Sequence, residues 1–126
     1  MMVPVPSNGS WSQRARAGRD LASFADVPEA AEALAGLLLD AEDTAVTRRT
    51  AEALTRAGTV AAVRLIARAV AEADDNHADW LQTGVQDALV GPDRVPDIAA
   101  VCGQLAHHPE GAVRRGASEI RAWTAL

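Results

Sequence analysis

The residues with the clearest capacity for chemistry lie in the last quarter of the chain. Cys102 is the one cysteine among 126 residues, and His107 and His108 follow it closely. A thiolate beside an imidazole base is the arrangement of a cysteine nucleophile. Cys102, however, shares a helical stripe with apolar residues, and the spacing turns both histidines away from that stripe. We interpret Cys102 as a core residue and expect no catalytic residue and no enzymatic activity.

A second cluster of polar side chains occupies positions 74–79, where Asp, Asp, Asn, His, Ala and Asp follow one another. These are metal-ligand types, but a calcium loop needs a glycine at its sharp turn and a distant glutamate, and a zinc site needs more His or Cys. We therefore predict a turn between two helices, with Asn76 as the cap of the second helix. No Gly-rich phosphate loop is present, and we expect neither a metal nor a cofactor.

The one basic stretch consists of Arg14, Arg16 and Arg19, which follow Trp11 and could contact phosphate. The rest of the chain argues against that role. All 12 basic residues are arginine, whereas Asp and Glu total 17, so the formal net charge is −5. Non-specific binding to nucleic acid or to an anionic membrane needs a cationic field. The charge balance therefore disfavours nucleic acid and membranes as partners.

We find no sequence feature that directs the protein out of the cytoplasm. One cysteine cannot form an internal disulfide, and the N-terminus lacks a basic segment followed by an apolar one. The longest apolar run, around 37–39, is far too short to cross a bilayer. We expect a cytoplasmic protein in which 1–10 form a disordered tail and 11–126 form a single domain.

The elements that position these residues are all predicted to be helices. Apolar residues recur at helical spacing, aromatic residues make up only 3% of the chain, and no segment alternates as a strand does. An N-terminal helix is expected over 11–24. Three helix pairs then follow, over 27–38 and 44–57, 59–74 and 77–90, and 96–107 and from 109 towards the C-terminus. Their ends are set by caps at Asp26, Asp43 and Asn76 and by a stop at Gly58.

The second helices of the three pairs carry one pattern. Val46, Leu81 and Val113 begin the copies, and small or apolar residues recur four and seven positions after each of them. A two-helix unit that repeats after roughly 32–35 residues is typical of a stacked helical array.

The sequence resembles HEAT repeats, in which an Asp-Pro turn leads into a helix reading Val-Arg, then small residues, then Ala-Leu. His108-Pro109 and Val113-Arg114 match this pattern with His in place of Asp, whereas Thr47 replaces the arginine in the first unit and Leu81-Gln82 replaces Val-Arg in the second. The resemblance covers the chain from about Asp26 onward. It implies a right-handed α-α superhelix of about three HEAT-like helix pairs plus an N-terminal helix, with a macromolecule gripped by the inner helices. Armadillo-like or irregular α-α packing is the alternative.

The repeat also predicts which side chains the inner helices present. With the first residue of each copy in the core, offsets two and six lie roughly 200° and 240° around the helix, away from the core. In the outer units these offsets hold Arg–Glu pairs that neutralise each other, whereas the middle unit leaves Asp87 unpaired beside Trp80. The predicted partner-binding residues are Trp80, Thr83, Asp87, Asp79, Arg48, Glu52, Arg115 and Glu119.

This surface favours a non-enzymatic protein–protein interaction module that binds a protein with a basic or mixed-charge surface. A regulatory or toxin-immunity-type inhibitor is one concrete form of such a module. The alternative class is a nucleic-acid-binding HEAT-like protein. Trp80 has two interpretations, because tryptophan is enriched at binding anchors but is also often buried for packing alone.

Overall fold

A computed structural model describes residues 10–91 and 96–124. Within these ranges the chain forms seven α-helices and one 3-10 helix, without a strand, so the predicted all-α class is confirmed. The predicted tail falls mainly on 1–9, which lie outside the described residues, and Ser10 is already the N-cap of the first helix. The elements are α1 (Trp11–Leu21), η1 (Ala22–Phe24), α2 (Pro28–Leu38), α3 (Thr44–Ala57), α4 (Val60–Glu72), α5 (Asp75–Val90), α6 (Ile98–Leu105) and α7 (Gly111–Thr124).

The ends of α3 and the start of α4 follow from the residues that the sequence places there. The side chain of Asp43 accepts a hydrogen bond from the backbone N–H of Ala45, as an N-cap should. Gly58 has a φ of 64°, a left-handed conformation that suits glycine, and its N–H donates to the oxygen of Leu54. Thr59 then caps α4 through Ala62. These expected boundaries are confirmed.

Other predicted boundaries were wrong by a few residues. Val27, not Asp26, is the N-cap of α2, and it contributes no side-chain bond. Asn76 lies inside α5, because the carboxylate of Asp74 accepts from the N–H of His77 and starts the helix earlier. In the third pair, Asp97 caps a shorter α6. The last helix begins at Gly111 rather than at Pro109.

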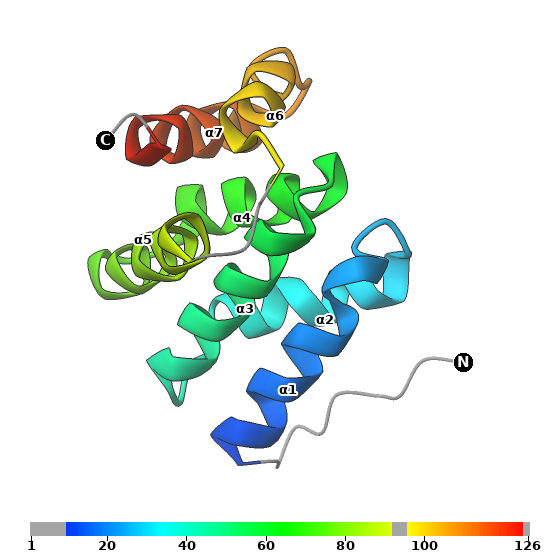
Figure 1. The fold of residues 1–126 in the computed structure, drawn as a ribbon, viewed down its shortest axis with the longest axis vertical. Helices are drawn as coiled ribbons and strands as arrows, with labels where there is room; N and C mark the ends of the chain where they lie inside the picture. Colours follow the sequence, from blue (N-terminus) through cyan, green and yellow to red (C-terminus); the bar gives the residue numbers. More distant parts are fainter. Residues whose placement is uncertain (1–9, 92–95, 125–126) are drawn as a thin grey trace.

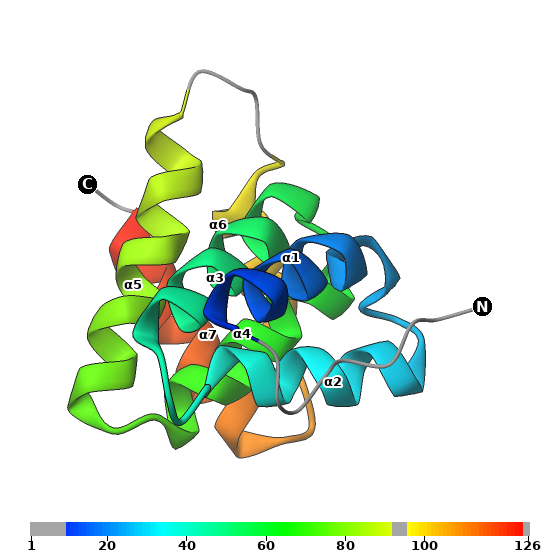
Figure 2. The same ribbon diagram turned by 90° about the horizontal axis from the view of Figure 1, so that it is seen from below.

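The residues that begin the three repeat copies on α3, α5 and α7 are all completely buried, as the repeat pattern predicts. Val46, Leu81 and Val113 each have no exposed surface. In both ribbon views α3 lies between α1 and α5, and α2 and α4 lie beneath α1 and α3 in Figure 2. The helices thus form stacked layers around one core.

The third pair departs from the regular stack that the repeat predicted. α7 packs most extensively across α4, with only a small contact on α5, whereas α5 packs along α3 (Figure 1). A regular wall of α3, α5 and α7 is therefore not what the described helices form.

Two glycines explain how closely the helices approach at these crossings. A Cβ at Gly84 would overlap the backbone oxygen of Arg48, and a Cβ at Gly116 would overlap the backbone oxygen of Ala67. Any larger residue at either position would force the two helices apart. α5 is thus held against the backbone of α3, and α7 against the backbone of α4.

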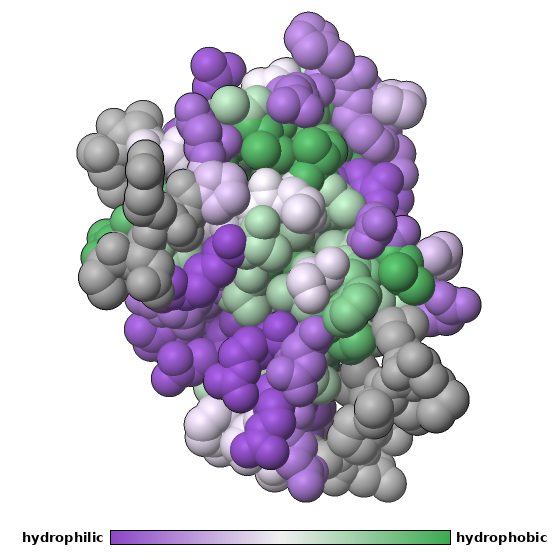
Figure 3. Space-filling model, turned by 45° about the vertical axis from the view of Figure 1, so that its right-hand side comes forward, coloured by the Kyte–Doolittle hydropathy of each residue, from purple (hydrophilic) through white to green (hydrophobic). Residues whose placement is uncertain are grey.

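The surface mixes strongly polar borders with an apolar stripe. Figure 3 shows this stripe running down one face between hydrophilic side chains. Among the described residues, no helix is long and apolar enough to span a membrane.

Candidate functional site

The structure brings six of the eight predicted binding residues onto two neighbouring helices. Arg48 and Glu52 lie on α3, and Asp79, Trp80, Thr83 and Asp87 lie on α5, which packs along α3. The remaining two residues, Arg115 and Glu119, are exposed on α7, which lies mainly against α4. No described hydrogen bond or ion pair joins these two residues to the other six.

Arg48, Trp80 and Asp87 form a compact cluster, which we call the Arg48 cluster. The Nε of Arg48 donates to Oδ2 of Asp87 at 2.6 Å, and Nη2 donates to Oδ1 at 3.2 Å. The same guanidinium lies over the ring of Trp80, 5.9 Å from its centroid. The bidentate bond to Asp87 raises the pKa of Arg48 above its usual value.

The expectation that Asp87 lacks a charge partner was therefore wrong. Its partner comes from a different helix, so the spacing within α5 could not reveal it. No described hydrogen bond or close ion pair joins Arg48 to Glu52, although Glu52 still attracts Arg48 electrostatically. Instead, Glu52 pairs with Arg56 at 3.1 Å and with Arg49 at 3.7 Å.

Gly84 is the residue that makes the cluster geometrically possible. Trp80 precedes it by one helical turn and Asp87 follows it by nearly one turn, so the three share a face of α5. Gly84 lies against the backbone at Arg48. This close approach brings both Trp80 and Asp87 to the Arg48 side chain. Thr83 contributes differently, since its hydroxyl donates back to the oxygen of Asp79.

Residues of α1 and α3, which pack against each other, line a groove of about 510 Å³. Four arginines line this arginine groove, together with one carboxylate and the exposed ring of Trp11. Its lining residues are Trp11, Ser12, Ala15, Arg16, Arg19, Arg49, Glu52, Ala53 and Arg56. The expected basic stretch is thus extended by arginines of α3.

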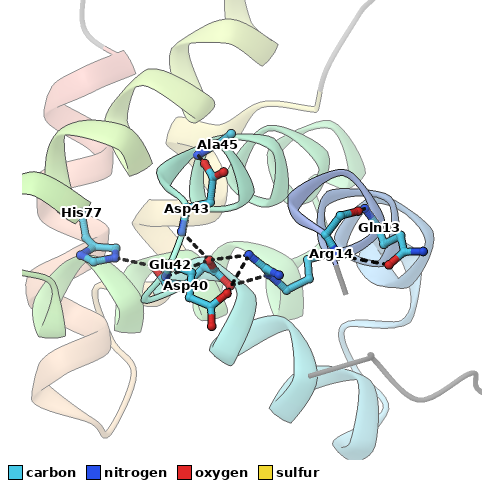
Figure 4. Close-up of polar contacts among 8 residues, drawn as sticks. Gln13, Arg14, Asp40, Glu42, Asp43, Ala45 and His77 are labelled. Carbon is cyan, nitrogen blue, oxygen red and sulfur yellow. Dashed lines mark hydrogen bonds and ion pairs between the residues drawn. The ribbon is translucent and has the colours of Figure 1, made fainter. Parts of the chain in front are cut away.

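Arg14 does not belong to that basic surface. Its side chain is buried, with 7% of the residue exposed, and its Nε donates to Oδ1 of Asp40 at 3.0 Å. Asp40 also accepts from the backbone N–H groups of Glu42 and Asp43. Arg14 and His77 approach Asp40 from opposite sides, which ties α1 and α5 to the loop between α2 and α3 (Figure 4).

His77 is held by two hydrogen-bond acceptors. Its Nε2 lies 2.8 Å from the backbone oxygen of Asp40, and its Nδ1 lies 2.9 Å from Oδ1 of Asp74. The bond to Asp40, assisted by Asp74, raises the pKa of His77 above its ordinary value. In turn, the N–H and the ring of His77 lower the pKa of Asp74. The cluster at 74–79 therefore forms a helix start, and in the described residues no group of three or more His, Cys, Asp or Glu could hold a metal ion.

Cys102 lies in the core with Ile98, Val101 and Leu105, as its position in the sequence predicts. Burial raises the pKa of its thiol to about 11. The thiol therefore stays protonated at neutral pH.

The sequence reasoning missed Gly84, Gly116 and Asp40. Both glycines occupy the third position after the first residue of a repeat, and a glycine inside a helix costs roughly 1 kcal/mol relative to alanine. That cost indicates a need for close packing and was a usable signal. Asp40 offered no such signal, because its partners Arg14 and His77 are distant in sequence.

The chain matches no family model, no curated protein and no solved structure at a significant level.

Proposed function

We propose that this protein is a non-enzymatic module that binds another protein through the α3–α5 surface centred on the Arg48 cluster. The observation that supports it most is the Arg48 guanidinium, which is fixed between the ring of Trp80 and the carboxylate of Asp87. Tryptophan and arginine are the residues most enriched among those that dominate binding energy at interfaces.

The geometry of this cluster suits recognition because its side chains are ordered before a partner arrives. Arg48 and Asp87 keep 40% and 28% of their side-chain surface exposed, and Trp80 is half-buried. A long side chain loses roughly 0.5–1.5 kcal/mol when binding immobilises it, so one that is already fixed loses less. The cluster therefore offers a rigid aromatic and charged surface at reduced entropic cost.

The charges of this surface favour a partner with a mixed-charge face. Arg48 and Asp87 neutralise each other, while Asp79, the residue before Trp80, stays exposed. A cation from the partner can bind at Asp79 while apolar groups pack beside Trp80. A HEAT-like but irregular arrangement of the pairs, in which α7 crosses α4, belongs to the same proposal. So do a cytoplasmic location and a regulatory or immunity-type role.

Affinity capture from cells that express the protein, followed by calorimetry with the purified partner, tests this function. Trp80→Ala should weaken binding by about thirtyfold, because truncating a central aromatic anchor costs roughly 2 kcal/mol. Phe24→Ala is the matched control, since Phe24 is also a large aromatic residue with part of its surface exposed but lies on η1. Equal binding by the two variants, with both folded by circular dichroism, would refute the proposed surface.

The alternative function, nucleic-acid binding, requires a continuous cationic surface. Of the described surfaces, the arginine groove between α1 and α3 fits that requirement best. Its lining also contains the carboxylate of Glu52, however, which disfavours a nucleic-acid backbone.

A further inference from the structure

The arginine groove has the composition of a site for an acidic chain segment. Its four arginines represent a third of the basic residues in a protein whose formal net charge is −5. Positive charge is therefore concentrated here, on a molecule that is acidic elsewhere. Such concentration attracts anionic groups and repels cationic ones.

Each wall of the groove comes from one helix face. On α1, Trp11, Ala15 and Arg19 recur at intervals of four, with Arg16 beside them. Arg16 and Arg19 are both exposed, and no described ion pair involves either of them. These two guanidinium groups are positioned to take carboxylates from outside.

The opposite wall, on α3, holds its charges in place. Arg49 and Arg56 flank Glu52, which lies 3.7 Å and 3.1 Å from them, and Glu52 keeps only 19% of its side-chain surface exposed. Ala53 and the facing Ala15 leave space between the charged groups, and the ring of Trp11, 47% exposed, borders that space. An apolar side chain fits there, with acidic groups on either side of it.

We propose that the arginine groove binds an acidic protein segment in which Asp or Glu residues flank an apolar side chain. The carboxylates pair with Arg16 and Arg19, and Arg–carboxylate pairs favour two parallel hydrogen bonds. The apolar side chain packs against Trp11, Ala15 and Ala53. This inference rests on the proposed function in one respect only, that the partner is a protein.

Glu52 is the reason to favour a peptide over a nucleic acid. A nucleic-acid backbone carries a negative charge at every phosphate, so one of them would face the fixed Glu52 carboxylate. A peptide can place its carboxylates at Arg16 and Arg19 and a neutral residue at Glu52. The net negative charge of the protein adds repulsion against a long polyanion.

Selection from a random-peptide display library on the immobilised full chain provides the test. Recovered peptides should be enriched in Asp and Glu around an aliphatic or aromatic residue. Fluorescence anisotropy with a recovered peptide should show binding that weakens about tenfold or more in the charge reversal R16E/R19E, and that weakens with added salt. R64E/R121E changes the charge equally at one position of α4 and one of α7, both outside the groove, and should shift binding by less than about twofold.

Arg49→Gln changes the opposite wall of the groove, on α3, and should also weaken peptide binding. It distinguishes a loss of binding from a folding defect in α1. Recovery of peptides without acidic enrichment, or equal affinity in both charge reversals, overturns the proposal. So does tighter binding of a single-stranded oligothymidylate than of any recovered peptide, if R16E/R19E abolishes it. If capture of a protein partner depends on Trp80 but not on Arg16 and Arg19, the proposed function is supported and the groove is ruled out as its binding site.

Discussion

The imidazole of His77, in the first turn of α5, donates from Nε2 to the backbone oxygen of Asp40 in the loop between α2 and α3. Its other nitrogen meets the carboxylate of Asp74. A carbonyl and a carboxylate can only accept, so both ring nitrogens must carry a proton to satisfy both bonds. The folded protein therefore stabilises the imidazolium form of His77.

The free energy of unfolding should consequently depend on pH near neutrality. The pKa of His77 is raised in the folded state, so its contribution is complete below the ordinary histidine pKa, about 6.5. That contribution is lost as the pH rises through the folded-state pKa. We expect the urea midpoint to fall across this window, measured by circular dichroism at closely spaced pH values.

The variant His77→Gln is the control for this pH dependence. Glutamine cannot titrate, so the decline above the ordinary histidine pKa should flatten. The acid side should also become shallower, because the imidazole ring helps to lower the pKa of Asp74. A wild-type profile with no decline in this window would contradict the assignment of a protonated His77.

Removal of the buried cation at position 14 should be costly. Arg14→Met leaves the Asp40 carboxylate, itself nearly buried, without its guanidinium partner. Breaking a buried ion pair from one side typically costs roughly 3 kcal/mol or more. Chemical denaturation should show that loss, and Arg16→Met, an exposed neighbour on the same helix, should change stability by less than about 0.5 kcal/mol. Similar values for the two variants would mean that the Arg14–Asp40 pair contributes little.

Glycine replacements should separate close helix contacts from ordinary helix positions. Gly116→Ala places a methyl group against the backbone of α4 and should destabilise the fold by roughly 2 kcal/mol or more. Gly103→Ala lies on α6 with no atom near the added carbon, and should stabilise by up to about 1 kcal/mol. Thermal unfolding of the two variants measures both effects, and a stable Gly116→Ala protein would rule out the close α4–α7 approach.

Cys102 should resist thiol reagents until the protein unfolds. A rise in the pKa of the thiol to about 11 lowers its thiolate fraction about 100-fold relative to an ordinary cysteine, and burial restricts access further. The rate of reaction with a chromogenic disulfide reagent should be at least that much lower in native protein than in denaturant. Rapid labelling of the native form would place Cys102 outside the core.

The sequence alone predicts the elements of this fold better than their arrangement. Helical spacing identified every helix among the described residues, and the shared offsets of Val46, Leu81 and Val113 correctly placed all three in the core. The same offsets could not show that α7 crosses α4, because a buried position at Val113 does not specify which helix covers it. Burial follows from local pattern, whereas the choice of neighbour depends on long-range packing.

In the candidate site, too, the sequence predicted local positions on a helix but not the contacts between helices. The offsets correctly brought Trp80 and Asp87 to one face of α5, but they paired Arg48 with Glu52 on its own helix. Side chains one turn apart are neighbours, yet such exposed pairs contribute only a few tenths of a kcal/mol. That small preference is overcome when Gly84 brings the carboxylate of Asp87 within bidentate reach of Arg48.

Sharing of one guanidinium between Trp80 and Asp87 couples one position of α3 to two positions of α5. Replacing Asp87 releases Arg48 from its orientation over the ring, and replacing Trp80 removes one of its two supports. Substitutions at the three positions should therefore be non-additive in a double-mutant cycle. In diverging descendants of this chain, Arg48, Trp80 and Asp87 are expected to be retained or exchanged as a set, with glycine kept at position 84 for as long as the set persists.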